Sequence, residues 1–378
     1  MRLGIVVTHP VQYQAPWFRA LAASPGIDLE VLFGHRAEPR EQAEAGFGVE
    51  FEWDEPLLDG YSHRFLRNSA AHPSVNRSSG VDSTEIAEVI RKSRFDAVIV
   101  SGWHSRLYLR AMRACWLQRV PVLVRSDSHS HAAGQRWRRA VKALLYRAII
   151  PRFDACLAVG SWSREYFLDY GAKADRVFVV PHMVSPKFQP LSRPRGALAT
   201  LLFAGKLTEW KRPLDFLEAL RIAIGQGARV AGMVAGDGPL RASCEAFAKE
   251  HRLPVAFPGF LNQSLIVEAY GEASALVVPS RETWGLVVNE AMSCGLPVFV
   301  SDAVGSHPDL VREGRNGFVY PHENVAALAA KIVAVHDPET LAQLGEVACQ
   351  QQGAVRKRAV EGVLEALERV RKPVEAFA

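Results

Sequence analysis

Short apolar runs bounded by turn-forming residues recur along the whole chain, and valine is frequent in them. Strands that are buried on both faces of a parallel sheet show this nearly continuous hydrophobic pattern. We therefore predict strands at 3–7, 29–33, 97–100, 120–124, 156–159 and 177–180, and again at 201–204, 230–235, 276–279, 298–300 and 317–320. Between most of them lie segments with helical periodicity, at 17–23, 83–92, 214–224 and 325–333.

The alternation of strands and helices predicts an α/β fold with two Rossmann-like, doubly wound parallel sheets. Residues 186–196 interrupt the pattern, contain three prolines and Gly196 with polar and charged residues between them, and so form the expected linker. We predict one domain at 1–188 and a second at 197–354, with a C-terminal helix at 355–378 that packs back on the first. Two such domains are expected to face a ligand-binding cleft, since open α/β sheets bind ligands at the carboxyl ends of their strands. The segment 35–83 fits the alternation poorly, and is either an inserted loop that faces a ligand or an ordinary surface excursion.

Composition narrows the class of protein. The chain has 378 residues, of which 48% are hydrophobic and 22% charged, and this is typical of a globular protein. No apolar run reaches the roughly 18 residues of a membrane-spanning helix. The five cysteines are widely spaced and never form a Cys-x-x-Cys pair, which is unlike a disulfide framework or a zinc cage. We expect a cytoplasmic protein.

Basic residues are concentrated between 101 and 160, where there are eleven of them and only two acidic residues, Asp127 and Asp154. Such a local field attracts an anionic partner. Within 136–153, arginines and Lys142 interleave with aromatic and aliphatic residues, as in helices that lie in a membrane interface. Two interpretations stay open: this helix docks on an anionic membrane at the inner face, or its apolar side belongs to the core and its arginines face water. No motif indicates nucleic-acid binding.

The segment 279–298 is the most informative part of the chain. A strand ends there, a loop carries Glu282, and Gly285 opens a helix that stops at Gly295. The free amides of Gly285, Leu286 and Val287 and the helix dipole would make a phosphate site. Glu290 lies one turn further along the helix, where a carboxylate suits the hydroxyls of a ribose. The order predicted is therefore sugar at Glu282, diphosphate at the helix start, and ribose at Glu290.

This segment resembles the Glu-x7-Glu motif of retaining glycosyltransferases of family 4, the group 1 glycosyl transferases with the GT-B fold. The resemblance extends over 201–330. It includes Gly205 and Lys206 after a strand, Lys211 in the next loop, the turn 236–240 and the short strand 257–259. In such enzymes these positions hold the donor, so the resemblance implies that Lys206 and Lys211 grip a diphosphate and that the backbone at Gly259 meets the nucleobase. Trp284 and Asp309 depart from the family pattern, which more often has Phe and Glu there.

The first half of the chain matches that family more loosely. Its usual Gly-Gly loop is replaced by 9–17, so His9, Gln12 and Tyr13 either contact the ligand or pack in a proline-stiffened loop. His104 follows one strand, and Asp127 and His129 follow the next, which puts them at the expected cleft. Asp127 lies near the place where family members often carry a histidine.

The resemblance implies an enzyme that moves a hexosyl unit from a UDP- or GDP-sugar to a hydroxyl acceptor, with retention of configuration and without a metal or cofactor. Its N-terminal domain would bind the acceptor, a glycan or a lipid-linked saccharide, and its C-terminal domain the donor. We assign catalytic roles to Glu282, Lys211 and Asp127. The alternatives are an isomerase of nucleotide sugars with the same fold, and a non-catalytic nucleotide-sugar binder at a membrane.

Overall fold

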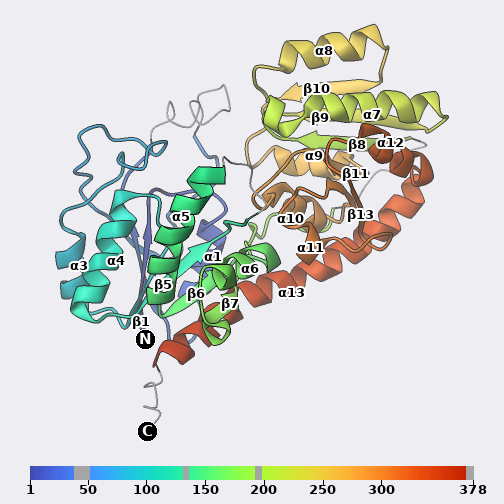
Figure 1. Cartoon of the computed structure of the whole chain (residues 1–378). Helices are drawn as coiled ribbons and strands as arrows, with labels where there is room; N and C mark the ends of the chain where they lie inside the picture. Colours follow the sequence, from blue (N-terminus) through green and yellow to red (C-terminus); the bar gives the residue numbers. More distant parts are fainter. Residues whose placement is uncertain (38–51, 131–135, 192–197, 372–378) are drawn as a thin grey trace. The chain divides into compact units, whose positions relative to one another are not determined.

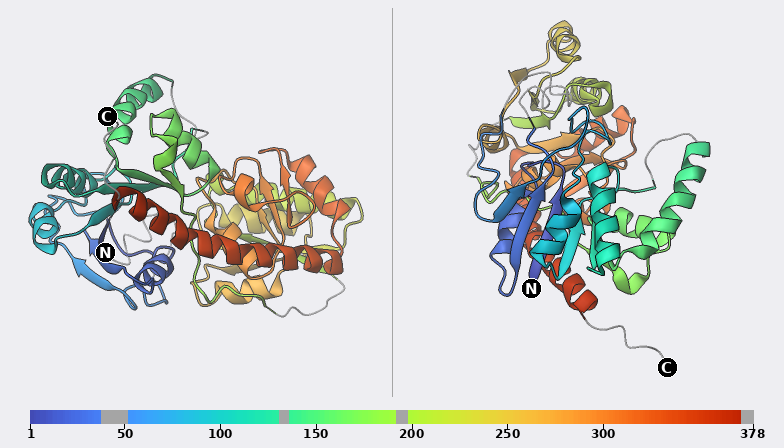
Figure 2. Two further views of the ribbon diagram at one scale, coloured as in Figure 1. Left: turned by 90° about the horizontal axis from the view of Figure 1, so that it is seen from below. Right: turned by 90° about the vertical axis from the view of Figure 1, so that its left-hand side faces the viewer.

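The computed structural model describes residues 1–37, 52–130, 136–191 and 198–371. These fall into two compact units (Figure 1). Of the described residues, unit 1 comprises 1–37, 56–130, 136–183 and 355–371, and unit 2 comprises 52–55, 184–191 and 198–354. One long helix, α13 (Pro338–Arg371), is continuous across the division and so contributes to both units (Figure 2).

Unit 1 is built on a seven-stranded sheet in the order β3-β2-β1-β4-β5-β6-β7, with every neighbouring pair parallel. Its strands are β1 (Arg2–Val7), β2 (Asp28–Phe33), β3 (Ser62–Phe65), β4 (Ala97–Val100), β5 (Val122–Ser126), β6 (Ala155–Ala158) and β7 (Val177–Val179). Its helices are α1 (Ala15–Ala22), α3 (Ile86–Ser93), α4 (Arg106–Gln118), α5 (Arg136–Ile149), α6 (Ser161–Asp169) and the end of α13.

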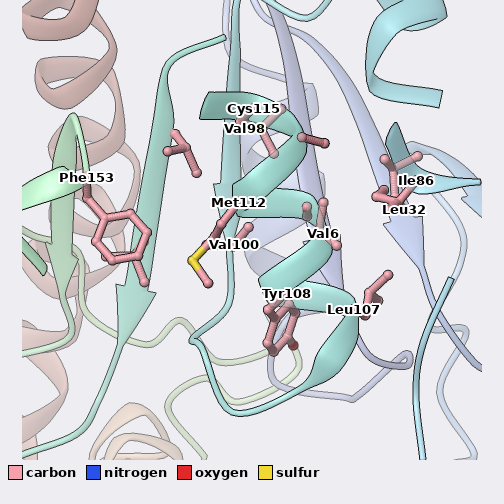
Figure 3. Packing of buried hydrophobic residues seen from close by; sticks show 14 of the residues in the cluster. Val6, Leu32, Ile86, Val98, Val100, Leu107, Tyr108, Met112, Cys115 and Phe153 are labelled. Carbon is pink, nitrogen blue, oxygen red and sulfur yellow. The ribbon is translucent and has the colours of Figure 1, made fainter. Parts of the chain in front are cut away.

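Successive residues of a strand point to opposite faces of the sheet, and the core of unit 1 is divided accordingly. On one face Val6 packs with Val98, Leu107 and Met112, which come from β4 and α4 (Figure 3). On the other face Leu3, Ile5 and Val7 pack with residues of α1 and of the end of α13, including Val363 and Leu367. Burial on both faces explains why these strands are continuously hydrophobic in the sequence.

Unit 2 is built on a six-stranded parallel sheet in the order β10-β9-β8-β11-β12-β13. Its strands are β8 (Ala199–Ala204), β9 (Val230–Ala235), β10 (Val255–Gly259), β11 (Ala275–Val278), β12 (Val298–Ser301) and β13 (Gly317–Tyr320). Its helices are α7 (Pro213–Gly225), α8 (Arg241–Glu250), α9 (Ile266–Glu272), α10 (Leu286–Ser293), α11 (His307–Leu310), α12 (Val325–Ala334) and the beginning of α13. The prediction of two Rossmann-like parallel sheets is confirmed.

Several predicted details differ from the structure. The helix expected at 355–378 begins already at Pro338. The first unit ends at Met183 where 188 was expected, and the described residues 52–55 belong to the second unit. The strand expected at 120–124 begins at Val122, because the amide of Val120 closes the end of α4 on the carbonyl of Cys115 with Arg119 in the left-handed conformation. The segment 35–83 contains β3, whose residues Ser62–Phe65 are mostly exposed at the edge of the sheet. A polar edge strand has no hydrophobic pattern, and the sequence therefore gave no indication of it.

The end of α13 is held against unit 1 at very short range. The indole nitrogen of Trp17 donates to the carbonyl of Ala359 at 3.0 Å. A Cβ atom on Gly362 would lie 2.3 Å from the carbonyl oxygen of Val179, so any side chain there would force the helix away from β7.

We expect Gly362→Ala to destabilise unit 1 by about 1–3 kcal/mol, because the added methyl group overpacks the contact between α13 and β7. Gly353→Ala is the matched control, since Gly353 lies in the same helix and a Cβ there would meet nothing within 4 Å. That variant should be neutral or more stable by up to about 1 kcal/mol. Denaturant unfolding of the two variants tests this, and equal midpoints would contradict the close contact.

Candidate functional sites at the carboxyl ends of the two sheets

Three strands of unit 2 end in glycine turns that are hydrogen-bonded to one another. The amide of Gly205, after β8, donates to Ala235 at 2.9 Å, and the amide of Gly236, after β9, donates to Gly259 at 2.7 Å. A Cβ on Gly236 would lie 1.8 Å from the carbonyl oxygen of Gly205, which leaves room for glycine alone. These turns form a closely packed backbone floor at the carboxyl edge of the sheet, where α/β proteins bind ligands.

Two lysines and a glutamate meet beside this floor. Lys211 Nζ donates to Glu282 Oε1 at 2.6 Å, and the two side chains are 27% and 13% exposed. Lys206 is half-buried, and its burial, together with the nearby charge of Lys211, lowers the pKa of its ammonium group. The structure therefore brings together the three charged residues that the sequence assigned to the sugar and the diphosphate.

The loop that carries Glu282 is fixed by its neighbours. The amide of Glu282 donates to Ala303 at 3.1 Å, and its carbonyl accepts from Gly305 at 3.0 Å. The Ser280 hydroxyl donates to the same carboxylate oxygen that Lys211 binds. Gly285 then turns the chain into α10 with a φ of 93°, in the left-handed region. Leu286 and Val287 open the helix as expected, and their amides stand in its first turn.

Glu290 lies in α10 but is buried, with 8% of its surface exposed. The hydroxyl of Tyr270 donates to Glu290 Oε2 at 2.8 Å. Burial raises the pKa of Glu290 to about 7, against the opposing effects of Tyr270 and Lys187. Lys187 also pairs with Glu55 at 3.3 Å, so residues from three parts of the chain surround this carboxyl group. Sequence reasoning missed Tyr270 because no motif links it to Glu290.

A pocket of about 410 Å³ lies beside β10, the strand that the resemblance predicted at 257–259. Phe257, Pro258 and Leu265 provide apolar walls, and Glu268 and Glu272 of α9 also line it. Strand β10 is thus present, while its contact with a nucleobase stays a prediction.

A polar pocket of about 240 Å³ lies in unit 1, at the carboxyl edge of its sheet. Its lining comes from the end of β5, from the segments that follow β1, β4, β5, β6 and β7, and from Val75 in the segment after β3. Four predicted residues line it: His9, Tyr13, His104 and Asp127. Gln12 and His129 do not line it, and the ring of His129 packs against Trp162 with centroids 5.0 Å apart.

Arg125 and His182 also line this pocket, and sequence reasoning did not select them. Both are buried. Arg125 is the last but one residue of β5, and His182 comes three residues after the end of β7. The rule that pointed to Asp127 could therefore also have pointed to them. The guanidinium group of Arg125 lies 4.5 Å from the centre of the Trp17 ring. His182 Nε2 lies 4.0 Å from Asp127 Oδ2.

The basic stretch forms α5, but its apolar residues divide between core and solvent. Tyr146 and Ile149 pack against the core of unit 1, and Ile150, in the turn that follows, is buried. Leu144 and Leu145 are 74% and 54% exposed. The side chains of 136–142, with most of the arginines, lie outside the described residues.

No group of three or more His, Cys, Asp and Glu side chains among the described residues is arranged to hold a metal ion. Within the same residues, no helix combines the length and the hydropathy needed to cross a bilayer.

Solved structures resemble the whole chain. Anabaena HepE in complex with UDP and glucose matches with a TM-score of 0.68 over 97% of this chain and 99% of that one, at 17% identity. Sucrose-phosphate synthase from Thermosynechococcus elongatus matches with the same TM-score over 96% of this chain and 97% of that one, at 20% identity. At these identities the likeness concerns the fold, which is that of GT-B glycosyltransferases.

Family models cover most of the sequence. Residues 188–351 match "Glycosyl transferases group 1", and residues 10–182 match "Glycosyl transferase 4-like domain". The chain belongs to the group 1 glycosyl transferases and has the GT-B fold. A D-inositol 3-phosphate glycosyltransferase from Streptomyces bingchenggensis is 31% identical over 199 residues, which are 47% of this chain and 44% of that protein. The chain thus spans less than half the length of this curated relative.

The raised pKa of Glu290 predicts a pH-dependent stability. A carboxyl group whose pKa in the folded state is about 7, against roughly 4.3 when unfolded, stabilises the fold at low pH and loses this contribution as the pH rises through 7. From pH 6 to pH 8 the wild type should lose about 1 kcal/mol relative to Glu290→Gln, which cannot ionise. Urea unfolding at both pH values measures the difference. Glu346→Gln, at an exposed carboxyl group, should behave like the wild type, and a Glu290→Gln variant with the same pH response as the wild type would refute the assignment.

Proposed function

We propose that this protein is a glycosyltransferase that binds a nucleoside diphosphate sugar in unit 2 and transfers the hexosyl unit to a hydroxyl acceptor, with retention of configuration. One observation carries the proposal: Lys206, Lys211 and Glu282 gather beside the first turn of α10 in a chain of the group 1 family. This is the charge pattern that a sugar diphosphate requires, with cations for the phosphates and a carboxylate for the sugar hydroxyls.

The electrostatics of this site favour a dianionic ligand. Lys206 lies near Lys211, and its lowered pKa means that its charge is costly without an added anion. A diphosphate would offset this cost, and the amides at the start of α10 would add partial positive charge. Lys211 has three N–H donors, so it can keep its bond to Glu282 while it donates to a phosphate. The same cations would stabilise the diphosphate as it leaves the sugar.

Glu290 is proposed to accept hydrogen bonds from the ribose. Its ionised form is the better acceptor, and Tyr270 holds one of its oxygens in place at 2.8 Å. The complex of HepE contains UDP and glucose, which supports a nucleotide-sugar donor for a chain of the same fold. The base is proposed to be uracil or guanine. Retention would let the leaving phosphate accept the proton of the acceptor, so positioning is the main task of the protein.

The pocket of unit 1 is the proposed acceptor site, for a glycan or a lipid-linked saccharide. We also infer that α5 lies on an anionic membrane surface, which would bring the enzyme to a lipid-linked acceptor. Leu144 and Leu145 support this inference because they are large apolar side chains exposed on a helix rich in arginine.

A panel of UDP- and GDP-sugars, assayed for release of the nucleoside diphosphate with and without simple glycoside acceptors, tests the activity. Release that rises with an acceptor, together with an α-linked product from an α-linked donor, supports the proposal. Conversion of the donor to another nucleotide sugar without an acceptor would indicate the isomerase instead. Tight binding without turnover of any donor would indicate the non-catalytic binder.

We expect Glu282→Ala and Lys211→Ala to lower the rate through the donor. Each loses a charge-assisted bond worth on the order of 1.5–3 kcal/mol, or roughly a tenfold to hundredfold fall in kcat/KM at limiting donor. Glu290→Ala should instead weaken binding of the nucleoside diphosphate, measured by calorimetry. Lys249→Ala and Glu346→Ala, at exposed positions, are the controls. Normal kinetics in the first two variants, or unchanged nucleotide affinity in the third, would show that the donor lies elsewhere.

Vesicle sedimentation tests the membrane inference. The protein should pellet with anionic vesicles, and binding should fall as salt is raised, since each Lys or Arg near an anionic leaflet contributes about 1 kcal/mol. Replacing Leu144 and Leu145 by Ser, or Arg136, Arg138 and Arg139 by Ser, should weaken binding. Leu265→Ser changes an exposed leucine of unit 2 and should have no effect. Equal recovery in the supernatant with anionic and neutral vesicles at low salt would rule out docking through α5.

A further inference from the structure

The pocket of unit 1 contains buried polar atoms that no described residue satisfies. Gln14 Oε1 and Ser101 Oγ both line the pocket, and neither has a hydrogen-bond partner among the described residues. Buried polar atoms in folded proteins nearly always have a partner. These two therefore suit a ligand, or water held with it, that offers both hydrogen-bond donors and acceptors.

The two charges of the pocket are presented differently. Arg125 is 6% exposed, and its Nη2 donates to the carbonyls of Val180 at 3.3 Å and Pro181 at 3.2 Å. Burial lowers the pKa of this guanidinium to about 10, which still leaves it charged at neutral pH. Asp127, by contrast, keeps 43% of its side chain exposed. A ligand in the pocket can therefore contact the carboxylate of Asp127, whereas the guanidinium group of Arg125 donates to the backbone of the protein.

His182 connects these two charges. A guanidinium nitrogen can only donate, so the contact of 3.4 Å between Arg125 Nη2 and His182 Nδ1 makes Nδ1 the acceptor. The ring proton then sits on Nε2, which faces Asp127 Oδ2 at 4.0 Å. Burial, together with the charge of Arg125, lowers the pKa of His182 to about 4, so the ring is neutral at neutral pH. Burial alone would raise the pKa of Asp127, but His182 and Arg125 outweigh it and hold the carboxyl group ionised.

We propose that this pocket takes an uncharged polyhydroxy ring, whose hydroxyls donate to Asp127, and that Arg125 and His182 are positioning residues that orient this carboxylate. A carboxylate accepts hydrogen bonds only and repels a phosphate or a second carboxylate. The volume of about 240 Å³ lies below the roughly 300–1,000 Å³ of pockets for drug-sized ligands, so one ring of a larger molecule enters. The identification of this ring as part of the sugar acceptor rests on the proposed function. The binding of the ring to the pocket is independent of the proposed function.

Saturation-transfer NMR on the full chain tests the binding without an assay of activity. The probes are myo-inositol and the methyl α-glycosides of glucose, mannose and galactose, each beside a phosphate ester of the same ring. At least one neutral probe should bind, and its phosphate ester should bind at least about tenfold more weakly. Equal or tighter binding of the phosphate esters would overturn the proposal, and so would the absence of binding by every probe.

Variants locate the effect in the pocket. Asp127→Asn should weaken the neutral probe about tenfold and reduce the discrimination against its phosphate ester, because Arg125 then lacks its counter-charge. His182→Gln keeps an N–H that can face Asp127, whereas His182→Asn does not, so the glutamine variant should retain more of the selectivity. Glu88→Ala removes an exposed carboxylate from α3 and should change neither quantity. Selectivity that is unchanged in both Asp127→Asn and His182→Asn would refute the roles assigned here.

Calorimetry with UDP and GDP, run on the same samples, separates this proposal from the proposed function. Nucleotide binding in unit 2 should persist in every one of these variants and serves as a check of folding. Sugar binding without nucleotide binding would overturn the donor site alone, and nucleotide binding without sugar selectivity would overturn the present inference alone.

Discussion

The central strands of both sheets are buried on both faces, and this constraint decides where the chain can bind a ligand. In unit 1 Val6 contributes to one core cluster, and Ile5 and Val7 contribute to another. Neither face of β1 can therefore bind a ligand. Polar side chains are then confined to the ends of strands and to the loops beyond them. Both candidate sites obey this restriction, since Lys206 follows β8 and Asp127 follows β5.

The charges of both sites are paired within the protein. Lys211 donates a hydrogen bond to Glu282. Arg125 donates to backbone carbonyl groups, packs against the Trp17 ring and lies near Asp127. Pairing lowers the cost of burying each charge and fixes the geometry in which it can meet a ligand. The two candidate sites differ in the charge that they offer to a ligand. In the proposed donor site Lys206 and Lys211 lie near a single carboxylate, that of Glu282, whereas the pocket of unit 1 exposes the carboxylate of Asp127.

Helix α13 supports the residues around both sites. In unit 2, Gln352 accepts from Asn289, which in turn accepts from the indole of Trp284 at 2.7 Å, next to the loop of Glu282. In unit 1, Ala359 accepts from Trp17, whose ring lies against Arg125. Trp284, a departure from the family pattern, thus has a buried hydrogen bond that phenylalanine could not make.

The sequence by itself determined the fold class, because burial on both faces leaves a continuous hydrophobic run that needs no knowledge of contacts. It also determined the donor-site candidates, since Lys206, Lys211, Glu282 and Glu290 stand at short, fixed distances from strand and helix ends. Only the tertiary structure decided which distant residues complete a site. Tyr270 reaches Glu290, and His182 reaches Asp127, from positions 20 and 55 residues away. It also decided the state of each carboxyl group: burial raises the pKa of Glu290, whereas His182 and Arg125 keep Asp127 ionised. Such effects depend on distance and on exclusion of water, and a linear pattern of residue types records neither.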